Sequence, residues 1–212
     1  MLKLYDYWRS SACYRLRIAF NLKGIGYDSE EVSLHPDHRA HTSEAFKAIN
    51  PQQRVPTVII DGQTHTQSMA ILDWLEETYP APALLPEDSH ERLRARAFAD
   101  TIACDIHPLN NVSVLKYLHE GFAAESEAIS EWYASWIIRG FAALEVWAQT
   151  RTSEFLFGDT PGLAEICLIP QIYNARRFDV DLSSFPRLVE IDANCQKLEA
   201  FQKALPEAVK PA

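Results

Sequence analysis

The sequence is poor in cysteine, and its few cysteines are widely spaced. Cys13, Cys104, Cys167 and Cys195 stand singly, without a CxxC pair or a paired Cys/His spacing. A disulfide framework and a structural zinc site are therefore both disfavoured. We expect a reducing, cytoplasmic setting in which these cysteines are small buried hydrophobic residues.

The chain also lacks a long apolar run and an excess of positive charge. No stretch approaches the roughly 18 apolar residues that span a bilayer, and Lys3 and Asp6 interrupt any signal-peptide pattern. The formal net charge of −9 disfavours nucleic acid and anionic membranes as partners. A chain of 212 residues is long enough for one large or two small domains.

Three of the histidines cluster in one short segment, which raises the question of a metal site. His35, His38 and His41 fall in one segment with Pro36. Their spacing is loose and the segment is polar, so a solvated loop is favoured over a ligand set. We predict no metal site.

The opening stretch predicts a strand that runs into a helix. Residues 1–7 are apolar and aromatic, Ser10 or Ser11 stands where a helix N-cap belongs, and Gly24 supplies a stop. Such a junction directs free backbone N–H groups and the positive end of the helix dipole at one place. That place favours an anion such as a thiolate, although a capped helix without further role explains the same residues.

The following residues predict the rest of a small sheet. Residues 25–34 favour a strand and 43–49 a short helix. Residues 55–60 and 64–66 favour two strands joined by the hairpin pair Asp61-Gly62. Residues 1–80 therefore predict a compact unit of order β-α-β-α-β-β-α.

Two junctions in this unit could hold a ligand. Pro56 opens a strand, and a cis Val55–Pro56 bond would turn the Val55 backbone outward to pair with an extended ligand. A trans proline at the start of an edge strand is the alternative. Ser68 is the next expected N-cap, so Gln67 and Ser68 present a second helix N-terminus, suited to a carboxylate.

The proline-rich residues 81–88 predict a linker, and 89–212 predict an all-helical domain. Its aromatic stripes favour a core, and Gly162 with Glu165 forms a weak capping box. The stripes are Trp132, Trp136, Phe141 and Trp147. The expected helices are 89–118, capped by Ser89 and kinked at His107-Pro108, then 125–150, 162–178 and 187–205.

This arrangement resembles the cytosolic glutathione transferases over the whole chain. The run Arg-Ser-Ser-Ala-Cys-Tyr-Arg-Leu-Arg-Ile-Ala at 9–19 is similar to the zeta-class motif, in which two serines and a cysteine precede Arg-x-Arg-Ile-Ala. Further similar segments are 50–56, 67–68, 104–115 and 174–182. The resemblance implies a thioredoxin-like domain at 1–80, a linker at 81–88, an all-α domain at 89–212, and a homodimer.

The resemblance also implies an activity. Zeta-class enzymes include isomerases that use glutathione to convert maleylacetoacetate to fumarylacetoacetate in tyrosine and phenylalanine catabolism. Three alternatives stay open: a maleylpyruvate isomerase, a broader glutathione transferase or α-haloacid dehalogenase, and a non-catalytic protein that binds partners. A hydrolase built on Ser11 or Cys13 is disfavoured, because no Gly-x-Ser-x-Gly elbow is present.

The resemblance assigns roles to particular residues. The Ser10 hydroxyl donates to the glutathione thiolate with Ser11 beside it, and Arg15 is a more distant aid to ionisation. Val55 pairs its backbone with the cysteinyl part, while Gln67 and Ser68 hold the γ-glutamyl carboxylate. The expected glutathione-binding residues are Ser10, Ser11, His41, Gln53, Val55, Pro56, Gln67, Ser68, His107 and Asn111.

A dicarboxylate substrate and the enolate formed from it need cations. We expect Arg9 and Arg177 to supply them. Arg176 is the alternate to Arg177, because adjacent helical side chains point about 100° apart.

Two features depart from the family pattern, and a third departs from the maleylpyruvate isomerases alone. The family cysteine position is Ala12, with Cys13 one residue along, which puts in doubt any role for a protein thiol. Gly162 stands where the family has Ser or Thr, at a cost of only a few tenths of a kcal/mol. Maleylpyruvate isomerases carry arginine after the paired asparagines, whereas this chain has Val112, which favours maleylacetoacetate.

Overall fold

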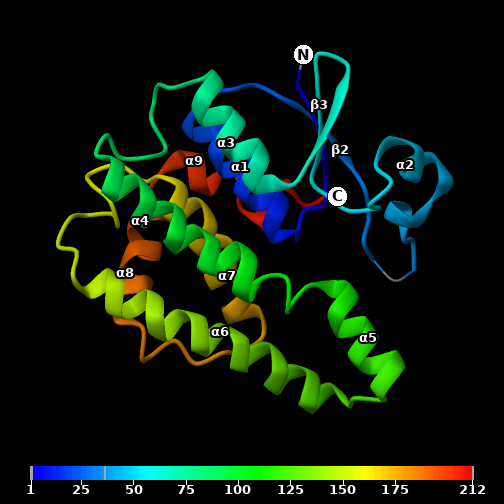
Figure 1. Ribbon diagram of the computed structural model, residues 1–212. Helices are drawn as coiled ribbons and strands as arrows, with labels where there is room; N and C mark the ends of the chain where they lie inside the picture. Colours follow the sequence, from blue (N-terminus) through cyan, green and yellow to red (C-terminus); the bar gives the residue numbers. More distant parts are fainter. Residues whose placement is uncertain (1, 36, 212) are drawn as a thin grey trace. The chain divides into compact units, whose positions relative to one another are not determined.

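The computed structural model describes residues 2–35 and 37–211, and contacts within the chain divide it into two compact units (Figure 1). The first unit runs to Leu84 and also includes the segment from Lys197 onward; the second is Leu85–Gln196. None of the described helices is long and apolar enough to cross a membrane. Among the described residues, no group of three or more metal-ligating side chains gathers at one point.

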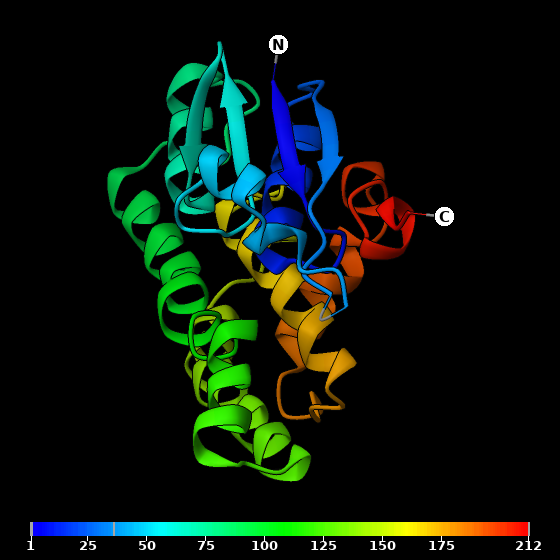
Figure 2. The ribbon, with the colours of Figure 1, turned by 90° about the vertical axis from the view of Figure 1, so that its right-hand side faces the viewer.

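The first unit is built on a four-stranded sheet of order β2-β1-β3-β4 (Figure 2). The strands are β1 (Lys3–Asp6), β2 (Asp28–Glu31), β3 (Thr57–Ile60) and β4 (Gln63–Thr66). β1 pairs with β2 in parallel and with β3 antiparallel, and β3 pairs with β4 antiparallel. The hairpin at Asp61-Gly62 is confirmed: both residues have positive φ, 50° and 79°, as a type I′ turn requires.

The helices of this unit follow the predicted order. They are α1 (Ser11–Leu22), η1 (Ala40–Thr42), α2 (Glu44–Ile49) and α3 (Ser68–Thr78), and α9 (Glu199–Gln202) and α10 (Pro206–Val209) at the C-terminal end. α1 packs against α3 and α9, so most of its side chains are buried. The thioredoxin-like α/β fold predicted for the N-terminal region is confirmed.

A buried arginine holds the end of β1 in place. Arg17 is fully buried, and its Nη1 donates to both carboxylate oxygens of Asp6 at 2.7 and 3.0 Å. Its Nη2 donates to the Trp8 carbonyl at 2.9 Å, and its Nε donates to the Ala204 carbonyl at 3.1 Å. The Arg17 guanidinium therefore links three segments by hydrogen bonds: the end of β1, the turn after it and the C-terminal segment.

A second buried ion pair fixes the exit from this unit. Lys23 Nζ donates to Glu76 Oε2 at 3.0 Å and to the carbonyls of Tyr79 and Pro82. The same carboxylate oxygen accepts from the Leu84 N–H at 2.9 Å. The chain after α3 is thus held at several points, rather than hanging as a free linker.

The C-terminal segment departs from the predicted division of the chain. We predicted that residues 89–212 form one helical domain, but the segment from Lys197 belongs with the first unit. The Asn21 amide donates to the Ala200 carbonyl at 2.9 Å, and Lys210 lies 5.2 Å from the centroid of the Trp8 ring. These contacts, with the Arg17 bond to Ala204, explain the grouping. The unit boundary after Leu84 falls within the segment predicted as a linker.

The second unit is entirely helical. Its helices are α4 (Ser89–Asp100), η2 (Thr101–Ile106), α5 (Val112–Phe122), α6 (Ser126–Gln149), α7 (Leu163–Arg177) and α8 (Pro186–Cys195). α7 is buried along most of its length and packs against α4 and α8. The prediction of an all-α second region is confirmed.

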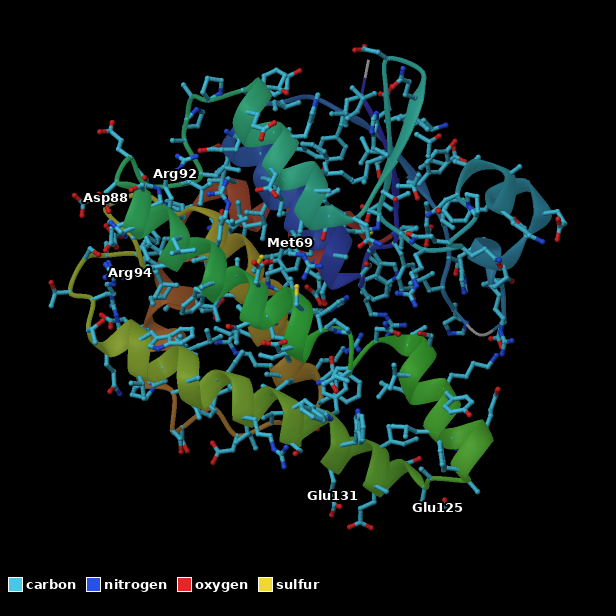
Figure 3. The ribbon with its side chains drawn as sticks, in the orientation of Figure 1. Met69, Asp88, Arg92, Arg94, Glu125 and Glu131 are labelled. Carbon is cyan, nitrogen blue, oxygen red and sulfur yellow. The ribbon has the colours of Figure 1, made fainter. Side chains whose placement is uncertain are left out.

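Three predicted helix boundaries in this region are wrong. Asp88, labelled in Figure 3, and not Ser89, caps α4, because its carboxylate accepts from the N–H groups of His90 and Glu91. The predicted helix 89–118 is interrupted after η2, a π-helical stretch, and restarts where Asn111 caps α5. The predicted helix 187–205 is likewise split into α8 and α9.

Buried carboxylates join the loops of this unit to its helices. Glu165 accepts from the Leu156 and Gly162 N–H groups at 2.7 and 2.8 Å, so the expected capping interaction at Gly162 is present from the glutamate side. Burial raises the pKa of the Glu165 carboxyl, while these N–H donors lower it.

The predicted core role of Trp147 is wrong, because this side chain is 48% exposed.

We predict that Arg17→Met destabilises the protein by about 3–5 kcal/mol, because it leaves the Asp6 charge buried without its partner. Urea unfolding followed by circular dichroism measures the loss. The exposed Arg54 is a matched control, and Arg54→Met should change stability by no more than about 0.5 kcal/mol. A similar small change for Arg17→Met would contradict the role of this ion pair.

Candidate functional site

The sheet register brings three predicted ligand-binding junctions to one edge. Tyr5 of β1 pairs with Thr57, the first residue of β3, so the end of β1 lies beside the start of β3. Thr57 also pairs with Thr66, the last residue of β4. Ser10 follows β1, Val55-Pro56 precedes β3 and Gln67-Ser68 follows β4, so all three junctions lie at this edge.

Of the two serines predicted as the N-cap of α1, Ser10 is the one that caps the helix. Its hydroxyl oxygen accepts from the Cys13 N–H at 3.3 Å, and its own N–H donates to the Tyr7 carbonyl at 2.8 Å. The Ser10 side chain is half-buried at the surface of the unit. Because the oxygen is an acceptor for the cap, the hydroxyl hydrogen can be donated to an anion at the helix N-terminus.

The cysteine beside Ser10 is not placed to act as a nucleophile. Cys13 is fully buried in α1, and burial raises the pKa of its thiol far above the ordinary range. A buried thiol that stays protonated is inert at neutral pH. The expectation that Cys13 is a small buried hydrophobic residue therefore suits its position.

Arg9 and Ser11 flank Ser10. Arg9 Nη2 donates to the Tyr7 hydroxyl at 3.2 Å, and its guanidinium lies 4.7 Å from the centroid of the Trp8 ring. The Arg9 Nε is buried and makes no hydrogen bond to any residue that the structure describes. Ser11 is buried as the first residue of α1. Arg9, one residue before the N-cap of α1, thus keeps one guanidinium donor without a partner among the described residues.

Val55 presents its backbone at the start of β3. The Val55–Pro56 peptide bond is cis, and β3 begins only at Thr57. Within residues 2–35 and 37–211, no hydrogen bond joins the Val55 N–H or C=O to another residue. The Val55 backbone therefore has a donor and an acceptor that an extended peptide could pair with.

Two glutamines near this edge have strained backbones. Gln53 has φ of 55° and Gln67 has φ of 69°, and such left-handed conformations are uncommon for residues other than glycine. Gln67, not Ser68 as predicted, is the N-cap of α3, yet its side chain donates to Gln52 Oε1 at 3.1 Å and does not cap the helix. Both residues lie at or beside junctions where a ligand is expected, although four other described residues that are not glycine also have positive φ.

Ser68 is the first residue of α3 and is joined to α1 by a buried arginine. Arg15 Nε and Nη2 both donate to Ser68 Oγ, at 3.1 and 3.0 Å. Both side chains are buried. The two predicted site residues are therefore in direct contact, although Arg15 was expected to aid the thiol at the other junction.

The other predicted glutathione contacts are spread over both units. In the first unit, half-exposed His41 lies in η1, with its Nδ1 3.2 Å from the Ser33 carbonyl oxygen. In the second unit, His107 ends η2, and Asn111 caps α5 by accepting from the Ser113 N–H at 2.8 Å. No role for these three follows from their contacts alone.

The two adjacent arginines of α7 have different partners within the second unit. Arg176 Nη1 is 2.5 Å from Asp192 Oδ2, and Asp192 is almost fully buried. Arg177 is exposed, with its guanidinium 4.8 Å from the centroid of the Phe178 ring. Burial of the Tyr133 hydroxyl raises its pKa to about 12, and the positive charge of Arg177 acts in the opposite direction. Arg176 is ion-paired with a carboxylate, whereas Arg177 contacts the uncharged Tyr133 and Phe178 side chains, so Arg177 is the stronger candidate for an anionic ligand.

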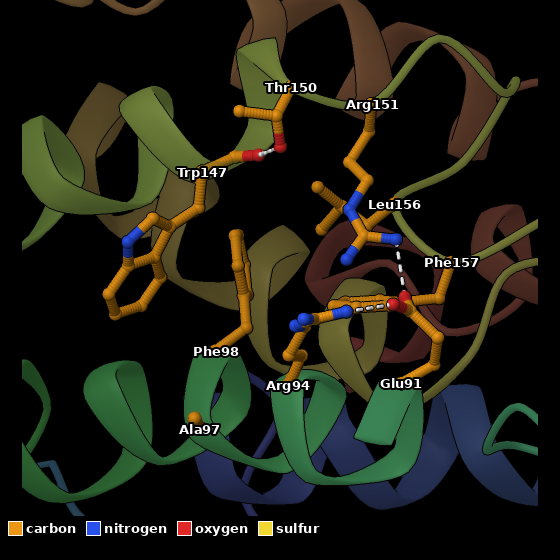
Figure 4. A pocket seen from close by; sticks show the side chains of 9 residues that line it. All are labelled: Glu91, Arg94, Ala97, Phe98, Trp147, Thr150, Arg151, Leu156 and Phe157. Carbon is orange, nitrogen blue, oxygen red and sulfur yellow. Dashed lines mark hydrogen bonds and ion pairs between the residues drawn. The ribbon is translucent and has the colours of Figure 1, made fainter. Parts of the chain in front are cut away.

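A pocket of about 510 Å³ lies elsewhere in the second unit, between the start of α4 and the end of α6 (Figure 4). Its charged lining is an ion-pair network in which Glu91 joins Arg94 and Arg151, and the guanidinium of Arg151 lies over Phe157. Both of its arginines are already ion-paired with Glu91, and the lining includes no residue that was assigned to ligand binding from the sequence.

Comparison with known proteins identifies the family. A family model described as the glutathione S-transferase N-terminal domain matches residues 9–78. Maleylpyruvate isomerase of a Ralstonia species is 47% identical over 209 residues, 98% of each chain. The solved holo structure of a maleyl pyruvate isomerase, a bacterial zeta-class glutathione S-transferase, superposes with a TM-score of 0.95 at 47% identity over 99% of each chain. This chain is a zeta-class glutathione S-transferase.

Other relatives of similar identity are named for a different substrate, maleylacetoacetate. Maleylacetoacetate isomerase of Rhizobium meliloti is 46% identical over 209 residues, 98% of this chain and 97% of the relative. A maleylacetoacetate isomerase of Anaeromyxobacter dehalogenans was solved with glutathione in its active site. It has a TM-score of 0.88 and 41% identity, over 100% of this chain and 98% of that one. Overall similarity therefore does not separate the two substrates.

Asn50 fixes the loop before β3, at the edge of the sheet where the three predicted ligand-binding junctions meet. The Asn50 side chain is buried, donates to the Arg54 carbonyl at 2.8 Å and to Thr57 Oγ1 at 3.0 Å, and accepts from the Gln52 N–H. It thereby fixes the loop that presents Val55. The sequence placed Asn50 within the segment 50–56 that is similar to the family, but assigned its side chain no role of its own.

We predict that a single cysteine of this transferase reacts readily with a thiol reagent in the native state. Cys13, Cys167 and Cys195 are buried as expected, but the expectation is wrong for Cys104, which is exposed. Burial raises the thiol pKa of both Cys13 and Cys195, so neither supplies thiolate near pH 8. Mass spectrometry after brief treatment with iodoacetamide should find label on Cys104, and on all four only after unfolding. Rapid native labelling of Cys13 would show that the N-terminus of α1 has a reactive protein thiol.

Proposed function

We propose that this protein is a glutathione-dependent cis–trans isomerase that converts maleylacetoacetate to fumarylacetoacetate in tyrosine and phenylalanine catabolism. The observation that carries the proposal is the unpaired Val55 backbone at the same sheet edge as the Ser10 hydroxyl. An extended tripeptide with a thiol in its middle residue suits this pair of groups. Its backbone can pair with Val55 while its sulfur approaches the N-terminus of α1.

The residues present suit glutathione in three places. Ser10 and the N-terminus of α1 favour a thiolate, because both direct donors and positive charge at one point. Val55 offers a backbone donor and acceptor to the cysteinyl part. Gln67 and Ser68 lie at the N-terminus of α3, where the γ-glutamyl carboxylate is expected, and no described side chain caps that helix end.

When bound, glutathione would supply a thiolate that adds reversibly to the conjugated cis double bond, so that rotation about the resulting single bond can precede elimination to the trans alkene. The protein's share is to lower the thiol pKa and to stabilise the charge that moves onto the substrate carbonyl oxygen. Ser10 serves the first task. Arg9, which keeps a buried Nε donor beside Ser10, serves the second.

The substrate carboxylates need cations that hold one pose. Arg177 is the candidate in the second unit, because it is exposed while Arg176 is paired with Asp192. The choice of maleylacetoacetate over maleylpyruvate depends on Val112. This residue is 59% exposed as the first residue of α5 and supplies an apolar group where an arginine would supply charge.

We also propose a cytoplasmic homodimer. The second unit exposes large apolar side chains on α4 and α6, with Leu93 65%, Val146 62% and Trp147 48% exposed. A second copy could cover them, as the family resemblance implies. Light scattering of the purified protein gives the mass that tests this.

The isomerase proposal predicts glutathione-dependent conversion of maleylacetoacetate that exceeds conversion of maleylpyruvate. The measurement is the amount of the trans isomer formed from each cis diacid, separated by chromatography. Ser10→Ala should lower kcat/KM by roughly 10- to 100-fold, the value of one hydrogen bond to a charged group. Cys13→Ser should keep the activity if it folds. Absence of a glutathione-dependent rate on either diacid ends the proposal, and faster turnover of dichloroacetate or chlorodinitrobenzene would favour a broader transferase.

Replacing the two α7 arginines should give opposite signatures. Arg177→Ala is expected to raise KM for the diacid roughly 10-fold or more, with a smaller loss of kcat and an unchanged melting temperature. Arg176→Ala should instead lower the stability by about 1–2 kcal/mol, because buried Asp192 loses its half-exposed partner. Steady-state kinetics and thermal melts of both variants measure this. An unchanged KM for Arg177→Ala would remove its anchoring role.

A further inference from the structure

The Arg15–Ser68 contact has a consequence for the direction of the Ser68 hydroxyl. A serine hydroxyl has two lone pairs that accept and one hydrogen that it donates. Arg15 Nε and Nη2 point two N–H donors at Ser68 Oγ, at 3.1 and 3.0 Å. With its lone pairs occupied, the hydroxyl can make a further hydrogen bond only by donating its own hydrogen.

No described residue accepts that hydrogen. Ser68 is 5% exposed, and its hydroxyl accepts from Arg15 without donating to any residue among 2–35 and 37–211. A donor that is almost fully buried is costly to leave without an acceptor. Ser68 opens α3, and Met69, labelled in Figure 3, follows it in the first turn. An anion at this helix end could take the hydroxyl hydrogen.

We propose that Arg15 is a positioning residue that fixes Ser68 as a hydrogen-bond donor and thereby makes this subsite selective for the α-carboxylate of the γ-glutamyl group. This inference rests on the proposed binding of glutathione. It moves Arg15 from the thiol of the middle residue, where the sequence suggested an indirect effect, to the γ-glutamyl end of the ligand. The Arg15 guanidinium does not bind the carboxylate itself. It acts by orienting the Ser68 hydroxyl and by placing a positive charge next to it.

Ser10 has the same arrangement at the other junction, with a weaker partner. Its oxygen accepts from one neutral N–H, that of Cys13, at 3.3 Å. Ser68 accepts from two donors of a charged group at shorter distances. Hydrogen bonds to charged groups are stronger, so Ser68 should be the more polarised donor of the two. The chain therefore sets both serines as donors, Ser10 for the thiolate of the middle residue and Ser68 for the γ-glutamyl carboxylate.

The test compares two ligands and two substitutions. The two ligands are glutathione and an analogue in which 4-aminobutyrate replaces the γ-glutamyl residue. The analogue lacks the α-carboxylate but keeps the amino group and the length of the chain. Calorimetry gives the dissociation constant of each for the wild type, Arg15→Met, Arg15→Lys and Ser68→Ala. Thermal melts of each variant report folding separately from ligand recognition.

We expect Arg15→Met to weaken glutathione binding roughly 10- to 100-fold and binding of the analogue by less than about threefold. Arg15→Lys keeps the charge but not the two-pronged donor, so its loss should be intermediate. Ser68→Ala added to Arg15→Met should weaken binding by no more than about twofold further, because the two residues act as one unit. Ser43 also caps a helix without an arginine, and Ser43→Ala should leave the ratio of the two affinities unchanged.

Equal losses of both ligands in Arg15→Met and Arg15→Lys would overturn the inference, because a purely structural arginine does not distinguish them. Additive effects of Arg15→Met and Ser68→Ala would do the same. Failure of the wild type to bind glutathione would instead overturn the proposed function itself. If Arg15→Met does not fold, the Arg15→Lys ratio decides the question on its own.

Discussion

The Arg17–Asp6 ion pair is the interaction on which the ligand edge depends. A buried arginine is tolerable only when most of its donors are satisfied, and Arg17 meets this condition by bonding to a strand end, a turn carbonyl and the C-terminal segment. The turn at Trp8 leads directly to Arg9 and Ser10. The position of the first serine at the helix N-terminus is therefore set by a group two turns further along α1.

A shared device appears at the two ends of the site. Ser10 and Ser68 each begin a helix and each accept from an N–H group of the protein, so both hydroxyls are left to donate. Donors that are already oriented need little reorganisation when an anion arrives. Cys13 is buried and stays protonated, so it supplies no anion at this helix N-terminus, and the anion must come from the ligand.

The sequence predicted local features well where the signal was local. The Asp61-Gly62 hairpin, the Ser10 cap and the all-helical second region follow from turn chemistry and periodicity. The N-cap of α3 was misplaced by one residue, because Gln67 adopts a positive φ that only its surroundings can impose. The break between η2 and α5 was read as a kink, since a π-helical stretch leaves no mark on apolar spacing.

Long-range partners could not be predicted at all. Nothing in the spacing of Arg15 or Arg17 indicates that one meets Ser68 and the other Ala204. Asn50 was missed for the same reason, because its role depends on a loop that folds back on it. The resemblance to a family supplied residue types at the site, but the direction in which each side chain donates came from the structure.

The return of the C-terminal segment to the first unit has a consequence for biosynthesis. Arg17 and its acceptor Ala204 are 187 residues apart, so the guanidinium leaves the ribosome long before that carbonyl exists. At about 5–20 residues per second, the delay is roughly 10–40 s. During that time the nascent α/β unit holds an incompletely satisfied cation in its interior, and its final packing waits for the last part of the chain to be released.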